Sequence, residues 1–374
     1  MSLVVTLSPA SRVLAGNPVR LDVSADSETT FQLAVAGTTV YQGSGFGTYF
    51  VYLQDLILPY LKPQVLYSDD ENLLIPVSGV AKACTVTVTD GTDTRTLSFT
   101  AYPGGLSRSV LRALHESNPF TARFLSPTGN IFFSLRGRGQ HLFMRETELV
   151  PLVFIYPPSG SLSITAAGKS MSLSGIASQL YALNLERVRR TIYDDYGILA
   201  PTFDLMLSGQ KVITLSITPS FLSHDRYLIR YLSSLGTYDI LECTGLMRRS
   251  LDESDEMTYS VFDKTVDGYV SERRRKPQRL VLKVSSGLMD EDRLLLFLDM
   301  LSSQDVTLLG YRGQDIRVIP STDGLNVPHN GPDPFAISID LRAADEDSHL
   351  SIDDVTEQLG SGSLHTSQFT SQFI

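Results

Sequence analysis

The chain has 374 residues, 42% hydrophobic and 19% charged, which is typical of an ordered globular protein with two or three domains. The net charge of −10 argues against a general nucleic-acid-binding surface, which needs clustered Lys and Arg. No apolar run reaches the roughly 18 residues of a membrane span, and the N-terminus lacks the pattern of a signal peptide, so we expect synthesis in the cytosol.

Residues 1–103 are predicted to form an Ig-like β-sandwich. Six short runs alternate apolar and polar residues, and turn signals separate them. Asp90-Gly91 predicts a hairpin turn between two of these strands. Apolar residues at helical spacing in the segment 49–63 predict a short helix within a sandwich connection, ending at Pro63.

Residues 104–200 are predicted to form a β-rich module that begins after Pro103-Gly104. An opening helix is expected over 106–116, with Ser107 as its N-cap, and a second helix should end near Gly197. Strands are expected between these helices, at 130–137, 140–147 and 149–157, followed by a hairpin over 161–175.

Residues 201–350 are predicted to contain two related strand-helix-strand units. Leu215–Ser234 aligns with Leu282–Ser303, so that Asp225-Arg226 falls on Asp292-Arg293 and Leu228 on Leu295. Duplication would place each leucine in the core on its own helix. Each Asp would cap its helix, and each Arg would reach a neighbouring strand. The alternating segment 334–344 is expected to be the last strand of this module.

Residues 351–374 are acidic and rich in Gly and Ser, so we expect a C-terminal arm that is flexible in isolation. Leu364, Phe369, Phe373 and Ile374 are spaced like anchors in this polar stretch. We therefore interpret Phe369, Phe373 and Ile374 as oligomer-interface residues that dock on a neighbouring subunit.

The residues provide no catalytic constellation, and we expect a non-enzyme without a cofactor or metal. The six histidines have no metal-ligand spacing, and neither a nucleophile elbow nor a phosphate loop occurs. Gly43, Gly45 and Gly47 are spaced wrongly for a dinucleotide fingerprint, so a β-turn or bulge is favoured. Cys84 and Cys243 cannot form a disulfide framework, and we expect Cys84 to be a small buried thiol.

Two charged groups leave alternatives open. Glu146 and Glu148 fall on one face of an expected strand, where they could be paired carboxylates for a divalent ion or, as we favour, a solvated strand face. The basic run Arg273, Arg274, Arg275 and Lys276 could bind phosphate. An exposed hairpin flank at an oligomer interface, pairing with acid on a neighbouring subunit, is favoured instead.

Several segments resemble tail-associated structural proteins of phages and prophages of gut Bacteroidales. The resemblance rests on Ser286-Gly287-Leu288, Leu301-Ser302-Ser303, the segment 316–320 and the strand Phe335 to Ala344, within residues 104–350. It implies a virion protein of the tail, tail tip or baseplate, made in the bacterial cytoplasm. Its partners would be other tail proteins and a host surface receptor.

We therefore expect a homo-oligomeric structural protein, since alternating strands leave sheet edges that a closed ring would cover. The alternative is a receptor- or carbohydrate-binding adhesin in which Tyr49, Tyr52 and Tyr60 stack on sugars. An unrecognised hydrolase is the third hypothesis.

Overall fold

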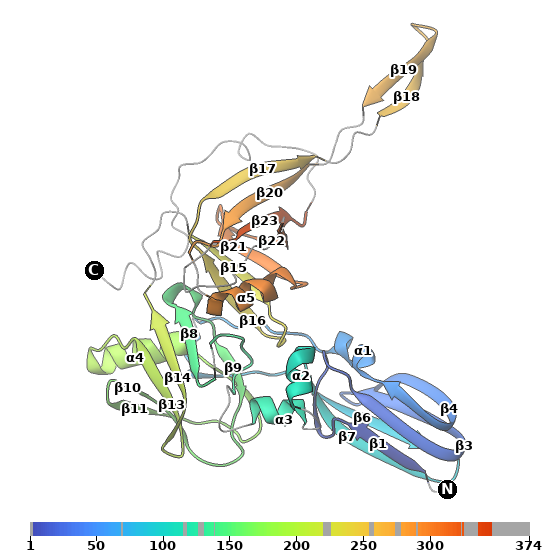
Figure 1. The fold of residues 1–374 in the computed structure, drawn as a ribbon, viewed down its shortest axis with the longest axis vertical. Helices are drawn as coiled ribbons and strands as arrows, with labels where there is room; N and C mark the ends of the chain where they lie inside the picture. Colours follow the sequence, from blue (N-terminus) through green and yellow to red (C-terminus); the bar gives the residue numbers. More distant parts are fainter. Residues whose placement is uncertain are drawn as a thin grey trace. The chain divides into compact units, whose positions relative to one another are not determined.

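The computed structural model describes residues 3–68, 70–114, 118–125, 131–137, 139–219, 226–253, 258–273, 278–288, 291–322, 324 and 336–345. The chain is mainly β, with several sheets and short helices, which confirms the predicted fold class (Figure 1). It divides into two compact units. One contains Met1–Pro219 and Leu232–Asp239, and the other contains Ser220–Tyr231 and Ile240–Ile374.

Six strands form the predicted Ig-like sandwich at the N-terminus. Their hydrogen-bonded order is β1-β3-β6-β7-β2, and β4 pairs with β3 (Figure 1). Alternation places Val86 and Val88 of β6 in the core while the intervening threonines are half-buried, because successive side chains of a strand point to opposite faces. The strands are β1 (Val4–Ser8), β2 (Arg12–Leu14), β3 (Arg20–Val35), β4 (Thr38–Tyr52), β6 (Lys82–Thr89) and β7 (Thr94–Tyr102).

Two of the six predicted runs belong to one 16-residue strand, β3. A bulge between Ser24 and Glu28 links them where the sequence suggested separate strands. Gly47 lies opposite this bulge with φ of +72°, a left-handed conformation that glycine adopts without strain. The glycine-rich run is thus part of a bulged strand, in agreement with the favoured interpretation.

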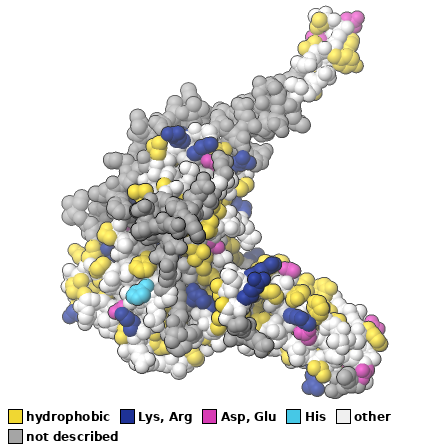
Figure 2. All heavy atoms as spheres, viewed as in Figure 1, with side chains coloured by type: hydrophobic (Ala, Val, Ile, Leu, Met, Phe, Trp, Pro, Cys, Tyr) yellow, Lys and Arg dark blue, Asp and Glu magenta, His cyan; other side chains and the backbone are white. Residues whose placement is uncertain are grey.

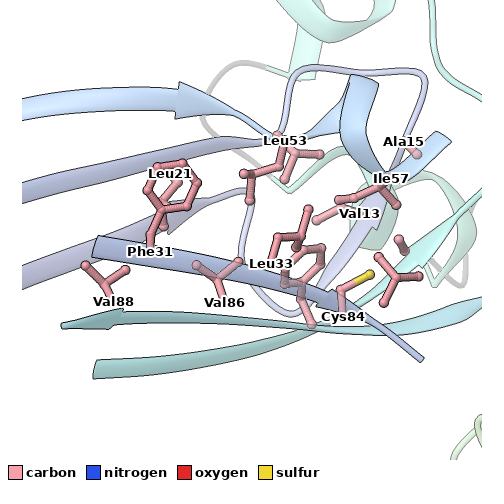
Figure 3. Close-up of a cluster of buried hydrophobic side chains, with 14 of the residues drawn as sticks. Val13, Ala15, Leu21, Phe31, Leu33, Leu53, Ile57, Cys84, Val86 and Val88 are labelled. Carbon is pink, nitrogen blue, oxygen red and sulfur yellow. The ribbon is translucent and has the colours of Figure 1, made fainter. Parts of the chain in front are cut away.

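All the core residues that Figure 3 labels in the sandwich are hydrophobic. Leu21 and Leu33 of β3 and Val86 of β6 are fully buried there. Leu53 and Ile57 enter the same core from the predicted short helix, which is present as α1 (Gln54–Ile57) followed by the 3-10 turn η1 (Leu58–Tyr60). This helix therefore contributes apolar side chains to the sandwich core.

The predicted hairpin turn at Asp90-Gly91 joins β6 to β7. The Asp90 carboxylate accepts hydrogen bonds from the backbone N–H groups of Asp93 at 2.6 Å and Thr92 at 2.9 Å. These bonds favour the charged form and hold the pKa of Asp90 below its usual value. The carboxylate thus fixes the turn and, with it, the register of the two strands.

Two further sheets complete the first unit. One has the order β5-β12-β9 and the other the order β11-β10-β13-β14-β8. The strands are β5 (Leu74–Pro76), β8 (His141–Arg145), β9 (Leu152–Ile155), β10 (Leu162–Ala166), β11 (Lys169–Leu173), β12 (Leu180–Leu183), β13 (Thr202–Leu207) and β14 (Gln210–Thr218). The β10–β11 hairpin was predicted. The segment 130–137 was expected to be a strand, but its described residues contribute only a single bridge, between Phe132 and Phe154.

Neither predicted module boundary separates independent sheets. β5 comes from the first predicted module and pairs with β12 of the second. β13 and β14 follow residue 200, yet they join the sheet of β8 and β10. Long-range strand pairing, which local turn signals do not encode, therefore unites the regions that the sequence appeared to divide.

Four helical segments accompany these sheets. The helices predicted after Ser107 and before Gly197 are present, and the second ends at Gly197 in a left-handed C-cap. Asn184 caps its start by accepting from the backbone N–H of Arg187 at 3.2 Å. The four segments are α2 (Arg108–Leu114), α3 (Pro119–Phe124), the 3-10 turn η2 (Glu146–Glu148) and α4 (Leu185–Tyr196).

The second unit is built on a seven-stranded sheet with the order β16-β15-β21-β22-β23-β20-β17. α5 (Glu291–Leu301) buries Leu296, Phe297 and Met300. The predicted last strand is present as β23. The strands are β15 (Tyr227–Leu232), β16 (Tyr238–Cys243), β17 (Met247–Glu253), β20 (Gln278–Ser285), β21 (Val306–Tyr311), β22 (Gln314–Ser321) and β23 (Ser338–Ala343). A separate two-stranded sheet pairs β18 (Thr258–Asp263) with β19 (Gly268–Arg273).

The predicted duplication is wrong. Leu228 lies on strand β15, whereas Leu295 lies on α5 with 51% of its surface exposed. The two segments share an apolar composition but not a conformation. The spacing of apolar residues in the first segment predicted a helix. The segment instead forms β15, because it pairs with the distant strand β21, and this tertiary pairing outweighs the local preference.

Candidate interaction surface

The unpaired edge of β4 is the main candidate for an interaction surface. Among the strands of the described residues, β4 pairs only with β3, so its 15 residues offer a free row of N–H and C=O groups. Proteins usually protect such an edge with charged residues or proline, because it can pair with another chain. β4 contains neither. It is therefore a long edge without the usual protection.

The outward face of β4 carries exposed aromatic rings. Phe46, Phe50 and Tyr52 are 74%, 54% and 46% exposed, because every second residue of the strand points away from the core. The Phe50 and Tyr52 rings lie edge to face, with centroids 5.5 Å apart. Exposed apolar patches on a protein surface are a feature of interaction sites, so this face of β4 is a candidate.

Charged groups from β3 lie beside these rings. The Arg20 guanidinium carbon is 4.5 Å from the centroid of Phe50, in a cation–π contact. The same guanidinium donates to the Asp22 carboxylate at 2.6 Å, and both side chains are exposed. The surface therefore combines aromatic faces with a hydrogen-bonding ion pair, and Figure 2 shows hydrophobic, basic and acidic side chains mixed on the sandwich.

The inward face of β4 explains why its glycines are needed. A Cβ atom at Gly45 would lie 2.5 Å from the Tyr49 ring, and one at Gly43 would lie 2.7 Å from the Phe31 ring. The Tyr49 hydroxyl is bonded to the Thr29 hydroxyl at 2.7 Å. Tyr49 is thus half-buried and held by the sandwich, so it is not the exposed sugar platform that the sequence suggested. Tyr52 and Tyr60 are exposed, as that interpretation requires.

Glu148 belongs to a buried charged cluster, which corrects both interpretations of the Glu146 and Glu148 pair. Arg136 donates through Nη1 to Glu148 at 2.8 Å and through Nη2 to Asp239 at 2.7 Å. All three side chains are almost fully buried. Glu146 instead pairs with Arg189. The two carboxylates diverge because η2 is a 3-10 turn and not a strand, so they form neither a shared ion site nor a solvated face.

The paired arginines of the expected duplication meet at one residue. Arg226 contacts the Glu242 carboxylate through Nε at 2.7 Å, and Arg293 donates through Nη2 to the Glu242 carbonyl at 3.2 Å. Glu242, on β16, is fully buried. Both arginines reach strand β16, as predicted, but only Arg293 does so from a helix, because Arg226 directly precedes strand β15. Asp225 and the Asp292 side chain lie outside the described residues.

These buried charged groups are bonded to partners inside the fold. A shallow hollow of about 270 Å³ is lined by Gln64, Val65, Leu66, Tyr67, Asp70 and Ile75. The Asp70 carboxylate accepts from the Asn72 backbone and side chain within 2.8 Å. Within the described ranges, no group of three or more His, Cys, Asp and Glu could hold a metal ion.

The predicted interface residues fall largely outside the described part of the chain. Arg273 ends β19, but its side chain is not described, and Arg274 and Arg275 lie in the following gap. Phe369, Phe373 and Ile374, with the whole C-terminal arm, also lie outside the described residues. In the described segments, no helix is long and apolar enough to cross a membrane.

Phe46, Phe50 and Arg20 were not singled out from the sequence. A usable signal was present, since β4 is a strand-length run without charge or proline that carries aromatic residues at alternate positions. What the sequence lacked was the pairing order of the sheet, which alone shows that β4 is an edge.

Comparison with known proteins returns only distant structural similarity. No protein-family model and no curated protein matches the sequence. A tandem of titin Ig domains is 12% identical, with a TM-score of 0.22, over 59% of this chain and all of that one. A bacterial ice-binding adhesin involved in host cell surface retention is 12% identical, with a TM-score of 0.15, over 76% of this chain and 91% of that one. Immunoglobulin domains 1–4 of Sidekick-1 are 10% identical, with a TM-score of 0.19, over 90% and 82% of the two chains.

Proposed function

We propose that the protein is a non-enzymatic structural component that assembles as a homo-oligomer, in the tail, tail tip or baseplate of a phage virion. The observation that carries the assembly is the free 15-residue edge of β4 with its exposed aromatic face. Strand pairing between copies would satisfy the edge hydrogen bonds, and aromatic contacts would add buried area. The phage setting rests on the sequence resemblance alone.

The first test is the oligomeric state. Multi-angle light scattering over a range of concentrations should show a defined oligomer for the native chain. Replacing Phe46 and Phe50 together by Lys should shift it towards monomer, because the charges would be buried against a second copy. Tyr193→Lys is the matched control, since Tyr193 is similarly exposed on α4. A native chain that is monomeric at every concentration would contradict the proposal.

The phage assignment has its own test. Genes for a tail tube and a tape-measure protein beside this gene would support it, and purified virions should contain several copies of the chain. Outer-membrane glycan-uptake genes at the same position would contradict it.

A receptor- or carbohydrate-binding role is the second candidate, and a different feature favours it. Phe50 and Tyr52 provide ring faces beside Arg20 and Asp22, which can donate and accept hydrogen bonds at the edge of a sugar. A glycan array should then detect binding that Tyr52→Ala removes and Tyr193→Ala leaves intact. Absence of binding across the array would leave only the assembly role.

A further inference from the structure

The direction of the backbone groups of β4 decides which of its residues can bond to another strand. The N–H of Leu53, directly after β4, donates to the Val19 carbonyl at 2.8 Å, and the Gly45 carbonyl accepts from the Thr29 hydroxyl of β3 at 3.2 Å. Both groups therefore point towards β3. Backbone bonds of an antiparallel pair alternate along a strand, so odd-numbered residues of β4 bond to β3 and even-numbered residues direct their N–H and C=O groups to the open edge.

Residues 42–52 are the regular part of this edge, which lies beside β3 (Figure 1). Their exposure alternates throughout, with the even-numbered side chains exposed on the outward face and the odd-numbered ones half-buried on the inward face. The alternation ends at Tyr41, next to a register shift in the β3–β4 pair. The even-numbered residues therefore combine open backbone groups with the outward face that carries the exposed aromatic rings.

A strand that pairs with this edge should match it in charge and in face. β4 contains no charged side chain, so a charged partner strand would bring unpaired charges against its aromatic rings. β4 of a second copy is equally uncharged. A two-fold axis perpendicular to the sheet joins two β4 strands antiparallel and keeps both sandwich cores on the same side of the joined sheet. A two-fold axis along the strands would make them parallel and put the cores on opposite sides.

The backbone bonds and the two faces together select the register. Even-numbered residues must lie opposite even-numbered residues, because a shift of one would set open groups against groups already bonded to β3 and would exchange the faces. Among these registers, one pairs the whole of residues 42–52, and it places Gly47 on the two-fold axis. Each outward aromatic ring then lies opposite a polar side chain of the second copy: Phe46 opposite Thr48, Phe50 opposite Ser44 and Tyr52 opposite Gln42.

The charges of β3 are compatible with this register. Three charged residues of β3 lie opposite outward residues of β4 in each copy. Two β3 strands in the joined sheet are three strand spacings apart, about 14 Å, which exceeds the screening length of about 8 Å at physiological salt. Each charge also shares its row with an uncharged residue of the other β3 strand: Arg20 with Gln32, Asp22 with Thr30 and Glu28 with Ser24.

We infer that two copies of this chain join through their β4 strands, antiparallel and with Gly47 on the two-fold axis. Every open N–H and C=O group of residues 42–52 then has a bonding partner, and neither β4 edge remains free to recruit a further chain. Phe46 lies diagonal to Phe46 and Phe50 of the second copy, so the outward rings of both copies form one aromatic surface. The inference rests on the homo-oligomer of the proposed function and specifies its contact.

Single-cysteine variants test the direction and the register of pairing. Co-expressed chains that carry Gln42→Cys and Tyr52→Cys should form disulfide-linked dimers under mild oxidation, because these positions lie opposite each other in the inferred contact. Neither variant alone should cross-link, and the native chain is the control for the buried Cys84 and Cys243. Cross-linking of Gln42→Cys with itself would indicate a parallel contact and overturn the inference. An absent cross-link in a co-expressed mixture that light scattering shows to be oligomeric would also overturn it.

A proline substitution tests the open backbone groups directly. Ser44→Pro removes an N–H that points to the edge and leaves the bonds to β3 in place, as edge strands tolerate. It should raise the dissociation constant by at least about tenfold, because each copy loses one donor. Ser44→Ala is the matched control, since it keeps the N–H and should assemble like the native chain. Circular dichroism should show both variants to be folded.

The outcomes separate this inference from the proposed function. A folded Ser44→Pro chain that assembles as tightly as Ser44→Ala would overturn the inferred contact and leave the proposed function standing. A native chain that is monomeric at every concentration would instead overturn the proposed function.

Discussion

The sandwich core and the cluster around Arg136 lie in the same unit but are stabilised in opposite ways. In the sandwich, Leu21, Leu33 and Val86 are fully buried, and the described residues of this core include no charged side chain. Around Arg136, one buried guanidinium meets two buried carboxylates from distant parts of the chain. Burying apolar surface is favourable wherever it occurs, whereas a buried charge is tolerated only while its partners stay in place.

The difference also bears on function. Buried charges can mark catalytic sites, yet Glu148 and Asp239 both accept hydrogen bonds from Arg136 inside the fold. The unpaired strand edge and the exposed aromatic rings of the candidate surface lie instead on β4.

The largest expected effect is at Arg136. Replacing Arg136 by Met should lower the free energy of unfolding by about 3–5 kcal/mol, because it leaves two carboxylates buried without a cation. Denaturant unfolding at neutral pH measures this. Arg20→Met is the control, since the Arg20–Asp22 pair is exposed and should contribute less than about 1 kcal/mol. Equal losses for the two variants would refute the contrast between buried and exposed pairs.

A smaller loss is expected from the sandwich core. Leu33→Ala should lower the free energy of unfolding by about 2–5 kcal/mol, through lost burial and the cavity left among well-packed neighbours. This loss should be independent of pH, since no side chain among the described residues of the sandwich core is ionised at neutral pH. A pronounced pH dependence in the difference between native and variant chains would contradict the apolar description of this core.

The smallest effect concerns the reactivity of Cys84 in the native state. Burial raises the pKa of the Cys84 thiol to about 11, so the reactive thiolate is scarce at pH 8. Alkylation followed by mass spectrometry should leave Cys84 unmodified in the native chain and modify it fully in denaturant. Modification should increase as the pH rises towards 11. Rapid labelling at pH 8 without unfolding would mean that the sandwich opens readily.

Much of the local structure followed from the sequence, because it depends on near neighbours. Alternation predicted the sandwich strands, Asp90-Gly91 predicted their hairpin, and Gly197 predicted the end of α4, each through a backbone preference carried by the residue itself. The buried thiol of Cys84 followed from the same alternation.

Tertiary structure alone decided the features that depend on partners distant in the chain. Residues 227–232 became a strand and not the expected helix because they pair with β21. Glu148 became a buried ion partner because folding brings Arg136 and Asp239 to it. The candidate surface on β4 likewise depends on the order of strands in the sheet. β4 is an edge strand because it has only one neighbour, β3, among the described strands. Spacing along a sequence encodes which face a side chain takes, but not which distant segment that face will meet.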